Sequence, residues 1–567
     1  MRSNNANRTK GQIDWNSIDW KTANRNVRNL RQRIFRATQE GDWDKVQSLQ
    51  RLMLRSLSNA AVSVRRVTQV NAGKNTPGID KVTVKTPEAR SKLLHELVSL
   101  TPWRAKPAKR VYIPKANGKS RPLGIPVMKD RALQAMVKNA LEPSWEARFE
   151  ASSYGFRPGR SAQDAIERIW TVAKSKSKVW VVDADIKGCF DNINHEHLLE
   201  TIGTFPAKSL IRQWLKAGYV EIGILHETTT GTPQGGVISP LLANISLHGM
   251  ESALGAQRRN KSHVATERTV IRYADDFVIM CRTKPDAEKA QAIIAEWLAE
   301  RGLQLSSEKT RIVHLREGFD FLGFHVRLYP CNQKSKGGWK ALVTPSKQSE
   351  LKIRKRLRDE MLHLNGQNVT TVVRRLNPII RGWANYFRTQ SASKTFHELD
   401  HFMFIRGCRF VKRLHPKKSR YWREHQYLGK RNPYRNDVNV FGDIEEPDIY
   451  LYKFSWTKIQ RHSMVKDTFS PDDPCLADYW RQRELAKIQD LAPTPLQLAR
   501  RQHGICPVCG ESLFNAERLE EHHVVSRDEG GPDVLDNLAL LHYFCHRQIT
   551  AHQLRERNRK KSRHDTH

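Results

Sequence analysis

Aspartates in two short apolar stretches are the residues of this sequence best suited to metal-dependent chemistry. The run VWVVDADI (179–186) is typical of a β-strand, and the alternation of strand side chains puts Asp183 and Asp185 on one face. The motif YADD, which ends in Asp275 and Asp276, is flanked by RTVIR and FVIM, and this pattern predicts a hairpin with both aspartates at its tip. Crowded carboxylates repel one another unless a cation neutralises them, so the pattern predicts a divalent metal site.

Mg²⁺ is the metal ion that such carboxylates favour, because hard Mg²⁺ prefers carboxylate oxygen. A pair of bridged Mg²⁺ ions can activate a 3′ hydroxyl and stabilise the leaving pyrophosphate, which is the chemistry of nucleotide polymerisation. Taken alone, YADD is equally consistent with an ordinary solvated acidic turn, since short motifs match by accident. The motif by itself leaves both interpretations open.

A second metal site is indicated among the last residues of the sequence. Two residues separate Cys506 from Cys509, and two residues separate His542 from Cys545. Two such pairs form a complete ligand set for tetrahedral Zn²⁺. The other cysteines are Cys189, Cys281, Cys331, Cys408 and Cys475. Because these are scattered, the cysteine pattern indicates metal ligation rather than disulfides.

The elements that must position these residues change in character along the chain. Apolar residues recur at helical spacing over 43–64, and a Gly- and Pro-containing loop follows at 71–80. From about residue 105 to about residue 330, strand-like and helical stretches alternate, which predicts an α/β or α+β catalytic body. The segment CNQKSKGGWK (331–340) is typical of a solvated linker or insertion.

Three helices that are both basic and amphipathic are predicted after that linker, near 348–364, 370–387 and 394–414. The first sets an apolar face of Leu351, Leu357, Met361 and Leu364 against Lys352, Arg354, Lys355, Arg356 and Arg358. A helix of this kind could pack on one face and bind phosphates with the other. Residues 415–500 show weak periodicity and indicate a basic connector, and the last 65 or so residues form a separate Cys/His module.

The charge of the chain predicts a polyanionic partner. Lys plus Arg number 96 against 59 for Asp plus Glu, a formal net charge of +37. Binding to a polyanion releases its counterions, so nucleic acid is the natural partner, with an anionic membrane surface as the competing interpretation. No apolar run of about 18 residues occurs and the first residues lack a signal-peptide core, so we expect an intracellular protein without a membrane partner.

Seven sequence blocks then appear in a fixed order. They are KRVYIPKANGKSRPLGIP (109–126), SYGFRPGRSAQDAI (153–166), VVDADIKGCFDNINH (181–195), GTPQGGVISPLLANI (231–245), RYADDF (272–277), GLQLSSEKT (302–310) and FDFLGF (319–324). With these blocks, the segment from about 70 to 330 resembles the reverse transcriptase domain of group II intron proteins. The resemblance makes the polymerase interpretation of YADD the stronger one.

The resemblance implies that Asp185, Asp275 and Asp276 bind the catalytic Mg²⁺ ions, with Asp183 outside the catalytic position and Asp191 structural. It also implies a site for deoxynucleoside triphosphates. Its residues would be Lys115 and Arg121, which grip the triphosphate, Phe190, which excludes a 2′ hydroxyl, and Gln234, at the nucleotide pocket. The alternatives are a solvated basic hairpin for Lys115 and Arg121 and a core aromatic for Phe190. Lys309 fits either a proton donor to pyrophosphate or a surface lysine.

Beyond residue 345 the sequence resembles the thumb and maturase domain of the same family. The matching stretches are RRLNPIIRGWANYF (374–387) and KRLHPKKSRYW (412–422). The resemblance implies that this part holds intron RNA in its active fold. Trp383, Tyr386 and Phe387 could stack on RNA bases, but aromatic residues at helical spacing are more often core, and we expect core here.

The C-terminal module resembles an HNH endonuclease. The resemblance implies that His522 and His546 bind one catalytic divalent ion, that His523 is the base that activates water, and that Asn537 fixes the loop of that base. The alternative is a zinc module that binds nucleic acid without cleaving it. The run RERNRKKSR (555–563) is interpreted as a disordered basic tail, with an added DNA clamp as the alternative.

Together these features predict a multidomain α+β protein: a right-hand polymerase of fingers, palm and α-helical thumb, then a basic connector and a zinc-containing ββα-metal HNH domain. The expected bounds are 1–70 for an N-terminal helical extension, 71–330 for fingers and palm, 331–425 for the thumb and maturase domain, 426–500 for a DNA-binding connector, and 501–567 for the HNH domain with its tail. The expected partners are intron RNA, target DNA and deoxynucleoside triphosphates, with the protein a monomer or dimer.

We expect this protein to assist splicing, to nick DNA and to copy the intron from the nick, in the cytoplasm of a bacterium close to the nucleoid. An organellar host is the alternative location. Two other functions compete: a reverse transcriptase of another retroelement, and a splicing factor with vestigial catalytic sites. The intact YADD and Asp185 argue against the second, and the thumb motifs with an HNH module argue against the first.

Overall fold

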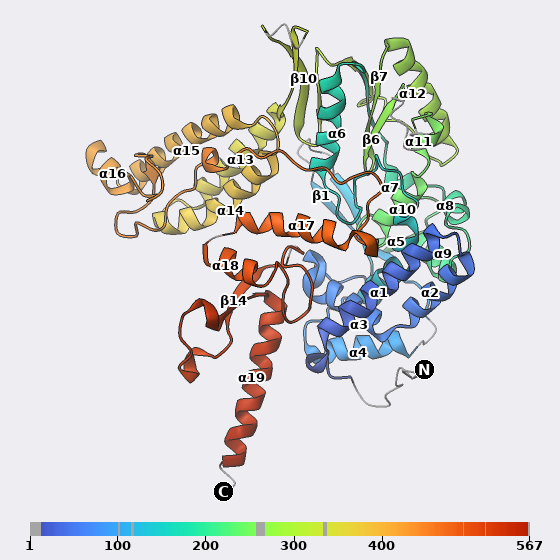
Figure 1. Ribbon diagram of the computed structural model, residues 1–567, viewed down its shortest axis with the longest axis horizontal. Coiled ribbons are helices and arrows are strands. Elements are labelled where there is room, and N and C mark those ends of the chain that lie inside the picture. Colours follow the sequence, from blue (N-terminus) through green and yellow to red (C-terminus); the bar gives the residue numbers. More distant parts are fainter. Residues whose placement is uncertain are drawn as a thin grey trace.

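The computed structural model describes residues 13–99, 103–114, 118, 120–256, 267–332, 337–491, 493–515 and 517–564. A body of mixed strands and helices lies beside a helical N-terminal region, a helical arm extends from the body, and a small module follows at the C-terminal end (Figure 1). Within the described residues, no helix is both long and apolar enough to cross a membrane.

The N-terminal helices pack on one long helix, α5 (Met128–Glu146). They are α1 (Trp20–Gln39), α2 (Trp43–Arg55), α3 (Leu57–Arg65) and α4 (Pro87–Val98). Asp19, Asp42 and Ser56 cap the first three helices, because each side chain accepts a hydrogen bond from a backbone N–H of the first turn. Ser56 has extended backbone and also ends α2, so the helical spacing over 43–64 belongs to two helices.

A four-stranded antiparallel sheet with the order β6-β7-β3-β8 carries the aspartates. Its strands are β3 (Trp180–Asp185), β6 (Thr269–Tyr273), β7 (Asp276–Cys281) and β8 (Arg311–His314). One face packs against α10 (Ser239–Ser246) and α12 (Lys284–Ala299), and the other against α6 (Ala162–Ser175). Because both faces are buried, β7 is a continuous apolar run rather than an alternating one.

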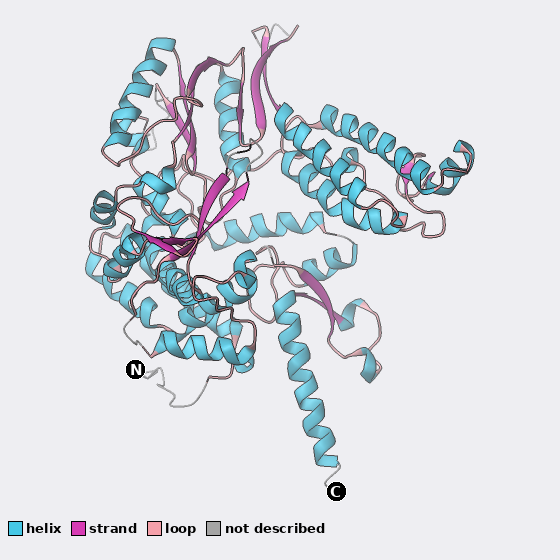
Figure 2. Ribbon diagram, turned by 180° about the vertical axis from the view of Figure 1, so that it is seen from behind, coloured by secondary structure: helices cyan, strands magenta, loops and turns pink. Residues whose placement is uncertain are grey.

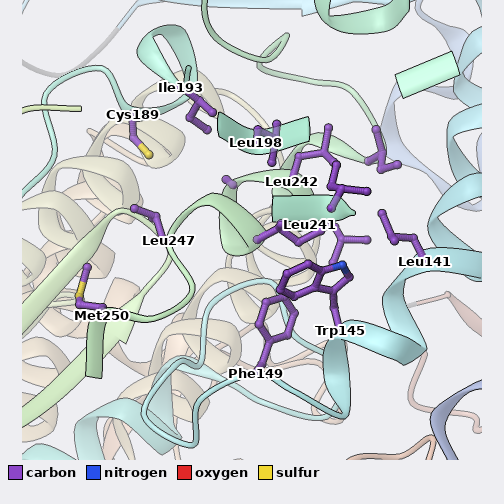
Figure 3. Packing of buried hydrophobic residues seen from close by; sticks show 14 of the residues in the cluster. Leu141, Trp145, Phe149, Cys189, Ile193, Leu198, Leu241, Leu242, Leu247 and Met250 are labelled. Atoms are coloured by element: carbon purple, nitrogen blue, oxygen red, sulfur yellow. The ribbon is translucent and has the colours of Figure 1, made fainter. Parts of the chain in front are cut away.

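The core on the α10 and α12 face of this sheet is mainly aliphatic and includes a few large aromatic side chains. Figure 3 shows Trp145 and Phe149 next to Leu241 of α10, and the ring centroids of Trp145 and Phe149 lie 5.6 Å apart. Short helices surround it: α7 (Cys189–Asn192), α8 (His195–Ile202), α9 (Lys208–Lys216) and α11 (Met250–Ala253). This packing fixes the loop between β3 and α7, which follows Asp185.

Two smaller sheets flank the body. In the first, β1 (Ala108–Pro114) pairs antiparallel with β2 (Ser120–Ile125) and parallel with β4 (Tyr219–Glu221), and β5 (Ile224–His226) completes it. In the second, β10 (Phe324–Pro330) lies between β9 (Phe319–Phe321) and β11 (Trp339–Pro345). The linker expected at 331–340 therefore contains the turn and first residues of a hairpin, and its residues 333–336 lie outside the described part.

The helical arm consists of α13 (Lys347–His363), α14 (Val369–Phe387), α15 (Ser393–Leu414) and α16 (Arg420–Tyr427), and Figure 2 shows it to be almost entirely helical. The predicted apolar face of α13 is partly wrong: Leu351 is exposed, and Ile353 is buried in its place with Leu357 and Met361. Trp383, Tyr386 and Phe387 pack into the arm's core, as expected.

The connector runs from the arm back across the body to the C-terminal module. It holds the short strands β12 (Leu428–Gly429) and β13 (Val440–Phe441), then α17 (Ala477–Lys487) and α18 (Pro493–Arg501). In the module, β14 (Leu519–His523) pairs with β15 (Leu538–His542), and α19 (Tyr543–His564) follows. The expectation of disorder at 555–563 is wrong, because α19 continues through this run and Arg557 contacts Asp528 and Glu529.

Candidate active sites

The YADD motif forms the tight turn between β6 and β7. Tyr273 pairs with Asp276 across the turn, and Ala274 has a φ of 60°, a left-handed conformation. Asp276 lies opposite Asp185 in the ladder between β3 and β7. The predicted hairpin with Asp275 and Asp276 at its tip is confirmed. The structure adds that this tip lies next to the end of the Asp185 strand.

Residues distant in sequence hold this turn in place. The guanidinium of Arg272 is buried and donates hydrogen bonds to Asn244 Oδ1 at 2.9 Å and to the carbonyl of Ala274 at 3.2 Å. Asn244 Nδ2 donates in turn to the carbonyl of Gly155 at 2.8 Å. A Cβ on Gly155 would lie 2.3 Å from the backbone nitrogen of Ala274, so only glycine permits this approach. Sequence reasoning missed these residues, although each lies in one of the seven ordered blocks.

The carboxylates crowd one another. Burial, followed by the charges of Asp275 and Asp185, raises the pKa of Asp276 to about 7. Burial is also the main reason why the pKa of Asp275 is raised. Lys309 Nζ lies 2.7 Å from Asp185 Oδ2, and this hydrogen bond raises the pKa of Lys309. A divalent cation would relieve the repulsion among the three carboxylates.

Asp183 is separated from this cluster by its own partner. It lies on the same face of β3 as Asp185, but Arg311 Nε on β8 lies 3.1 Å from Asp183 Oδ2. The side chain therefore forms an ion pair on the neighbouring strand. This geometry agrees with its expected position outside the catalytic set.

Three of the residues expected to bind a nucleotide, Phe190, Gln234 and Arg121, can be placed in the structure. Phe190 is half-buried and meets Phe156 edge to face, with ring centroids 6.3 Å apart. Gln234 Nε2 donates to Asp191 Oδ2 at 3.0 Å. Arg121 is exposed on β2, and its charge opposes the rise in the pKa of Asp275. Lys115 lies outside the described residues.

The zinc ligands expected from the sequence come together. The Sγ atoms of Cys506, Cys509 and Cys545 and a ring nitrogen of His542 all lie within 4.8 Å of one another, and all four residues are buried. The Nε2 of His542 is 3.0 Å from the carbonyl of Ser512, and its Nδ1 is 3.3 Å from Cys509 Sγ, so Nδ1 is the nitrogen turned toward the thiols. This set suits tetrahedral Zn²⁺.

Among the described residues, this is the one group of three or more potential ligands gathered so tightly. The three carboxylates near the YADD turn are too few to fill the octahedral coordination sphere of Mg²⁺, which retains waters and substrate oxygens.

The histidines of the C-terminal module lie on two facing elements. His522 on β14 and His546 on α19 have ring centroids 5.0 Å apart, and His546 Nδ1 lies 2.8 Å from Glu520 Oε2. Burial, followed by the charges of the neighbouring histidines, lowers the pKa of His522 and favours the neutral ring that binds metals. His523 forms a hydrogen bond with Asp533. Glu520 and Asp533 were not anticipated from the sequence.

Asn537 ties down the loop that follows His523. Its side chain accepts from the backbone nitrogen of Val525 at 2.8 Å and donates to the carbonyls of Val525 and Pro532 at 2.9 and 3.0 Å. An asparagine is needed for this, because both an acceptor and two donors are used.

Four protein families match parts of the chain. They are the N-terminal domain of reverse transcriptase (residues 15–97), reverse transcriptase or RNA-dependent DNA polymerase (113–326), the maturase-specific domain of group II introns (351–428) and HNH endonuclease (506–552). Protein YkfC of Escherichia coli K12 is 34% identical over 321 residues, 50% of this chain and 83% of that protein. Group II intron-encoded protein LtrA of Lactococcus lactis is 27% identical over 541 residues, 80% of this chain and 86% of that protein.

The chain belongs to the group II intron-encoded proteins. Another relative, an uncharacterized 91 kDa protein in the cob intron of Schizosaccharomyces pombe, is 26% identical over 496 residues, 74% of this chain and 58% of that protein.

The resemblance seen in the sequence is thereby confirmed. This group II intron-encoded protein is an RNA-directed DNA polymerase with a maturase domain and an HNH endonuclease domain. The fold predicted from the sequence, a right-hand polymerase with a helical thumb followed by an HNH domain, is also confirmed, and the helical arm corresponds to the thumb. Both enzyme families use metal ions.

Proposed function

We propose that this protein copies RNA into DNA at Asp185, Asp275 and Asp276, with Mg²⁺ as the metal. The observation that carries the proposal is the direct pairing of Asp185 with Asp276, which brings carboxylates from two strands to one edge of the sheet. When bound, the Mg²⁺ pair would activate the primer 3′ hydroxyl and stabilise the leaving pyrophosphate. The chain's own contribution is to hold the three carboxylates close together in a partly buried site.

Four further side chains would bind the incoming deoxynucleoside triphosphate. Arg121 and Lys115 would bind the triphosphate, a role for which cationic donors are suited. Phe190 would lie against the sugar and exclude a 2′ hydroxyl, with Phe156 beside it as a support. Gln234 would line the pocket from the loop that contacts Asp191.

We further propose that the thumb and maturase region binds the phosphates of structured intron RNA. Arg358 on α13 and Arg406, Arg409 and Arg413 on α15 line one shallow depression between the two helices. Burial and the neighbouring guanidinium groups lower the pKa of Arg406. A phosphate would relieve the repulsion among these cations, and RNA helices are recognised mainly through phosphates and shape.

For the nuclease, we propose that His523 activates water beside a divalent ion held by His522 and His546. Asn537 would keep the loop of His523 in place. A separate Zn²⁺ held by Cys506, Cys509, His542 and Cys545 would stabilise the fold of the module. The nick would supply the 3′ hydroxyl from which the polymerase copies the intron.

We propose the following domain bounds: 1–70 for the N-terminal helical extension, 71–330 for the fingers and palm, 331–425 for the thumb and maturase domain, 426–500 for the connector, and 501–567 for the HNH domain with its tail. The connector and the HNH domain would bind target DNA. A bacterial cytoplasm, with the protein close to the nucleoid through its DNA contacts, is the proposed location.

Deoxynucleotide incorporation on a primed RNA template with Mg²⁺ tests the polymerase proposal. The intact protein is compared with the double variant Asp275→Ala plus Asp276→Ala, and intron RNA binding is measured for both. We expect incorporation by the intact protein only, with equal RNA binding. If the intact protein binds RNA and incorporates nothing, the chain is a splicing factor with a vestigial palm.

A further inference from the structure

The zinc cluster of the nuclease module is in direct contact with the N-terminal helices of the polymerase. Figures 1 and 2 both place the C-terminal module beside these helices. Arg65, the last residue of α3, is 7% exposed, and its Nη2 lies 3.0 Å from Cys545 Sγ. The same guanidinium lies 3.7 Å from Glu517 Oε2 of the module and 4.8 Å from the centre of the Trp20 ring. A buried cation of the polymerase therefore touches one of the zinc ligands.

The charge of the cluster explains why a cation belongs there. Three thiolates and one neutral imidazole around Zn²⁺ leave one negative charge in excess. Burying a net charge is unfavourable unless an opposite charge or hydrogen bonds compensate it. Within the described residues, the cation that hydrogen-bonds a cysteine of the cluster is Arg65 of α3, which lies 480 residues before Cys545 in the chain.

The rest of the interface is built around this contact. Asn24 Nδ2 donates to the carbonyl of Cys509 at 2.9 Å, and Arg28 Nη2 donates to the carbonyl of Gly510 at 3.3 Å and pairs with Glu511. Both acceptor carbonyls lie in residues 505–513, the loop around Cys506 and Cys509 that we call the zinc knuckle. From the other side, Gln548 Nε2 on α19 donates to the carbonyls of Asn16 and Ile18.

The two parts also share one hydrophobic core. Trp15, Trp20 and Val64 from the N-terminal helices belong to the same buried cluster as Leu513 and Leu541 of the module. A module attached only through its linker would not bury these side chains against the polymerase. The apolar contact fixes the position of the module, and the polar contacts fix its orientation.

The connector is anchored as well. Arg31 of α1 binds Asp472 of the connector with Nε and Nη2, at 2.8 and 2.7 Å, and Nη2 also lies 2.9 Å from Glu142 of α5. The carboxylate of Asp164 accepts from the backbone nitrogen of Val465 at 2.7 Å. Anchoring upstream of the module reduces the entropy that docking must overcome.

We propose that the zinc site of the nuclease is completed by the polymerase: Arg65 neutralises the buried zinc–thiolate cluster, so that zinc retention and docking of the HNH module stabilise each other. The inference rests on the proposed ligation of Zn²⁺ by Cys545. Its consequence is that the nuclease keeps a fixed orientation relative to the polymerase while it holds zinc. Arg65 is a positioning residue in this scheme and takes no part in nucleotide or phosphodiester chemistry.

The test uses full-length, zinc-loaded protein and measures the rate of zinc transfer to a chromogenic chelator. Arg65→Met removes the charge and keeps most of the side-chain volume. The control is Arg66→Met, because the neighbouring Arg66 is exposed. We expect zinc loss to accelerate by roughly tenfold or more in Arg65→Met, as for other groups that contact metal ligands, and to be unchanged in Arg66→Met. RNA-templated incorporation serves as the folding control.

Docking is measured separately, by hydrogen–deuterium exchange of the knuckle residues 505–513. Exchange should rise in Arg65→Met and, for the wild type, on removal of zinc. If Arg65→Met fails to fold, the double variant Asn24→Ala plus Arg28→Ala replaces it, since it loosens the interface and leaves Arg65 and the four ligand side chains in place. Zinc loss at the wild-type rate in the variant that folds overturns the coupling. A wild-type protein that binds no zinc overturns the proposed zinc site itself, a distinct result that metal analysis reveals before any variant is made.

Discussion

Asp185 on β3 lies directly opposite Asp276 on β7, at the last pair of the antiparallel ladder between the two strands. The ladder delivers one carboxylate from each strand to the same edge, and the turn adds Asp275 next to them. The register therefore assembles the proposed polymerase site, and residues that hold the register or the turn should matter as much as the aspartates.

Gly155 provides the sharpest test of how the turn is held. An added Cβ would lie 2.3 Å from the backbone nitrogen of Ala274, so Gly155→Ala must displace the YADD turn. We expect incorporation to fall by roughly 100-fold, because small displacements of reacting groups have effects of that size. The comparison is Gly382→Ala on α14, where an added Cβ meets nothing within 4 Å. Equal activity of the two variants would show that the turn tolerates displacement.

The raised pKa of the Glu150 carboxyl predicts that the folded protein loses stability as the pH rises. Burial, followed by the charge of Glu251, raises the pKa of this carboxyl from 4.5 to about 7. The folded protein therefore binds the proton more tightly than the unfolded chain, so this stabilisation is complete below pH 4.5 and is lost as the pH rises through 7. The loss is at most about 3 kcal/mol.

Glu150→Gln should remove that part of the pH dependence. The amide oxygen can still accept the hydrogen bond from the backbone nitrogen of Glu251 at 2.8 Å. Urea unfolding at pH 5 and pH 8 measures the difference: the free energy of unfolding of the wild type should fall more steeply than that of the variant. Parallel slopes would mean that Glu150 ionises freely in the folded protein.

Removal of zinc should abolish DNA nicking by the HNH domain and leave RNA-templated DNA synthesis intact. In Cys506→Ser the tetrahedral set loses a thiolate, so the module should lose zinc and DNA nicking, because structural zinc contributes directly to folding. The buried clusters that pack on the two faces of the aspartate-bearing sheet contain none of these residues, so RNA-templated incorporation should persist. Metal analysis, nicking and incorporation are measured on one preparation. Nicking at the wild-type rate by zinc-free protein would refute the structural role of the metal.

His523 should be required for nicking. Its removal in His523→Ala is expected to reduce the rate by about two orders of magnitude or more, the usual contribution of a general base. His552→Ala is the matched control, since this histidine on α19 is exposed and pairs with Glu556 at 3.4 Å. Zinc content should be unchanged in both variants. Nicking by His523→Ala at the control rate would favour a nucleic-acid-binding module without cleavage.

The local parts of the sites could be predicted from the sequence because local patterns determine them. Strand alternation placed Asp183 and Asp185 on one face, and the family resemblance selected Asp185. The apolar runs around YADD predicted the hairpin, and the spacing of two Cys/His pairs predicted the zinc cluster. The apolar face of α13 was harder, because Leu351 and Ile353 both fit a helical repeat among many basic residues, and tertiary packing chose Ile353.

Contacts between distant segments could not be predicted in this way. The hydrogen bonds from Arg272 to Asn244 and from Arg65 to Cys545 join residues whose proximity depends on the whole fold. Nothing in the composition near Arg65 distinguishes it from the other basic residues of the N-terminal helices. The same holds for α19, whose basic run is fixed as a helix by Arg557 and the acidic residues that it contacts.

Two aspartates on one face of β3 distinguish a proposed catalytic carboxylate from one held in an ion pair. Asp185→Asn removes a carboxylate opposite Asp276, whereas Asp183→Asn removes one that pairs with Arg311. Each variant is assayed for Mg²⁺-dependent deoxynucleotide incorporation on a primed RNA template, with intron RNA binding as the control for folding. The predicted result is loss of incorporation in Asp185→Asn and near wild-type incorporation in Asp183→Asn. Incorporation that survives in Asp185→Asn, or is lost equally in both, would contradict the proposed polymerase site.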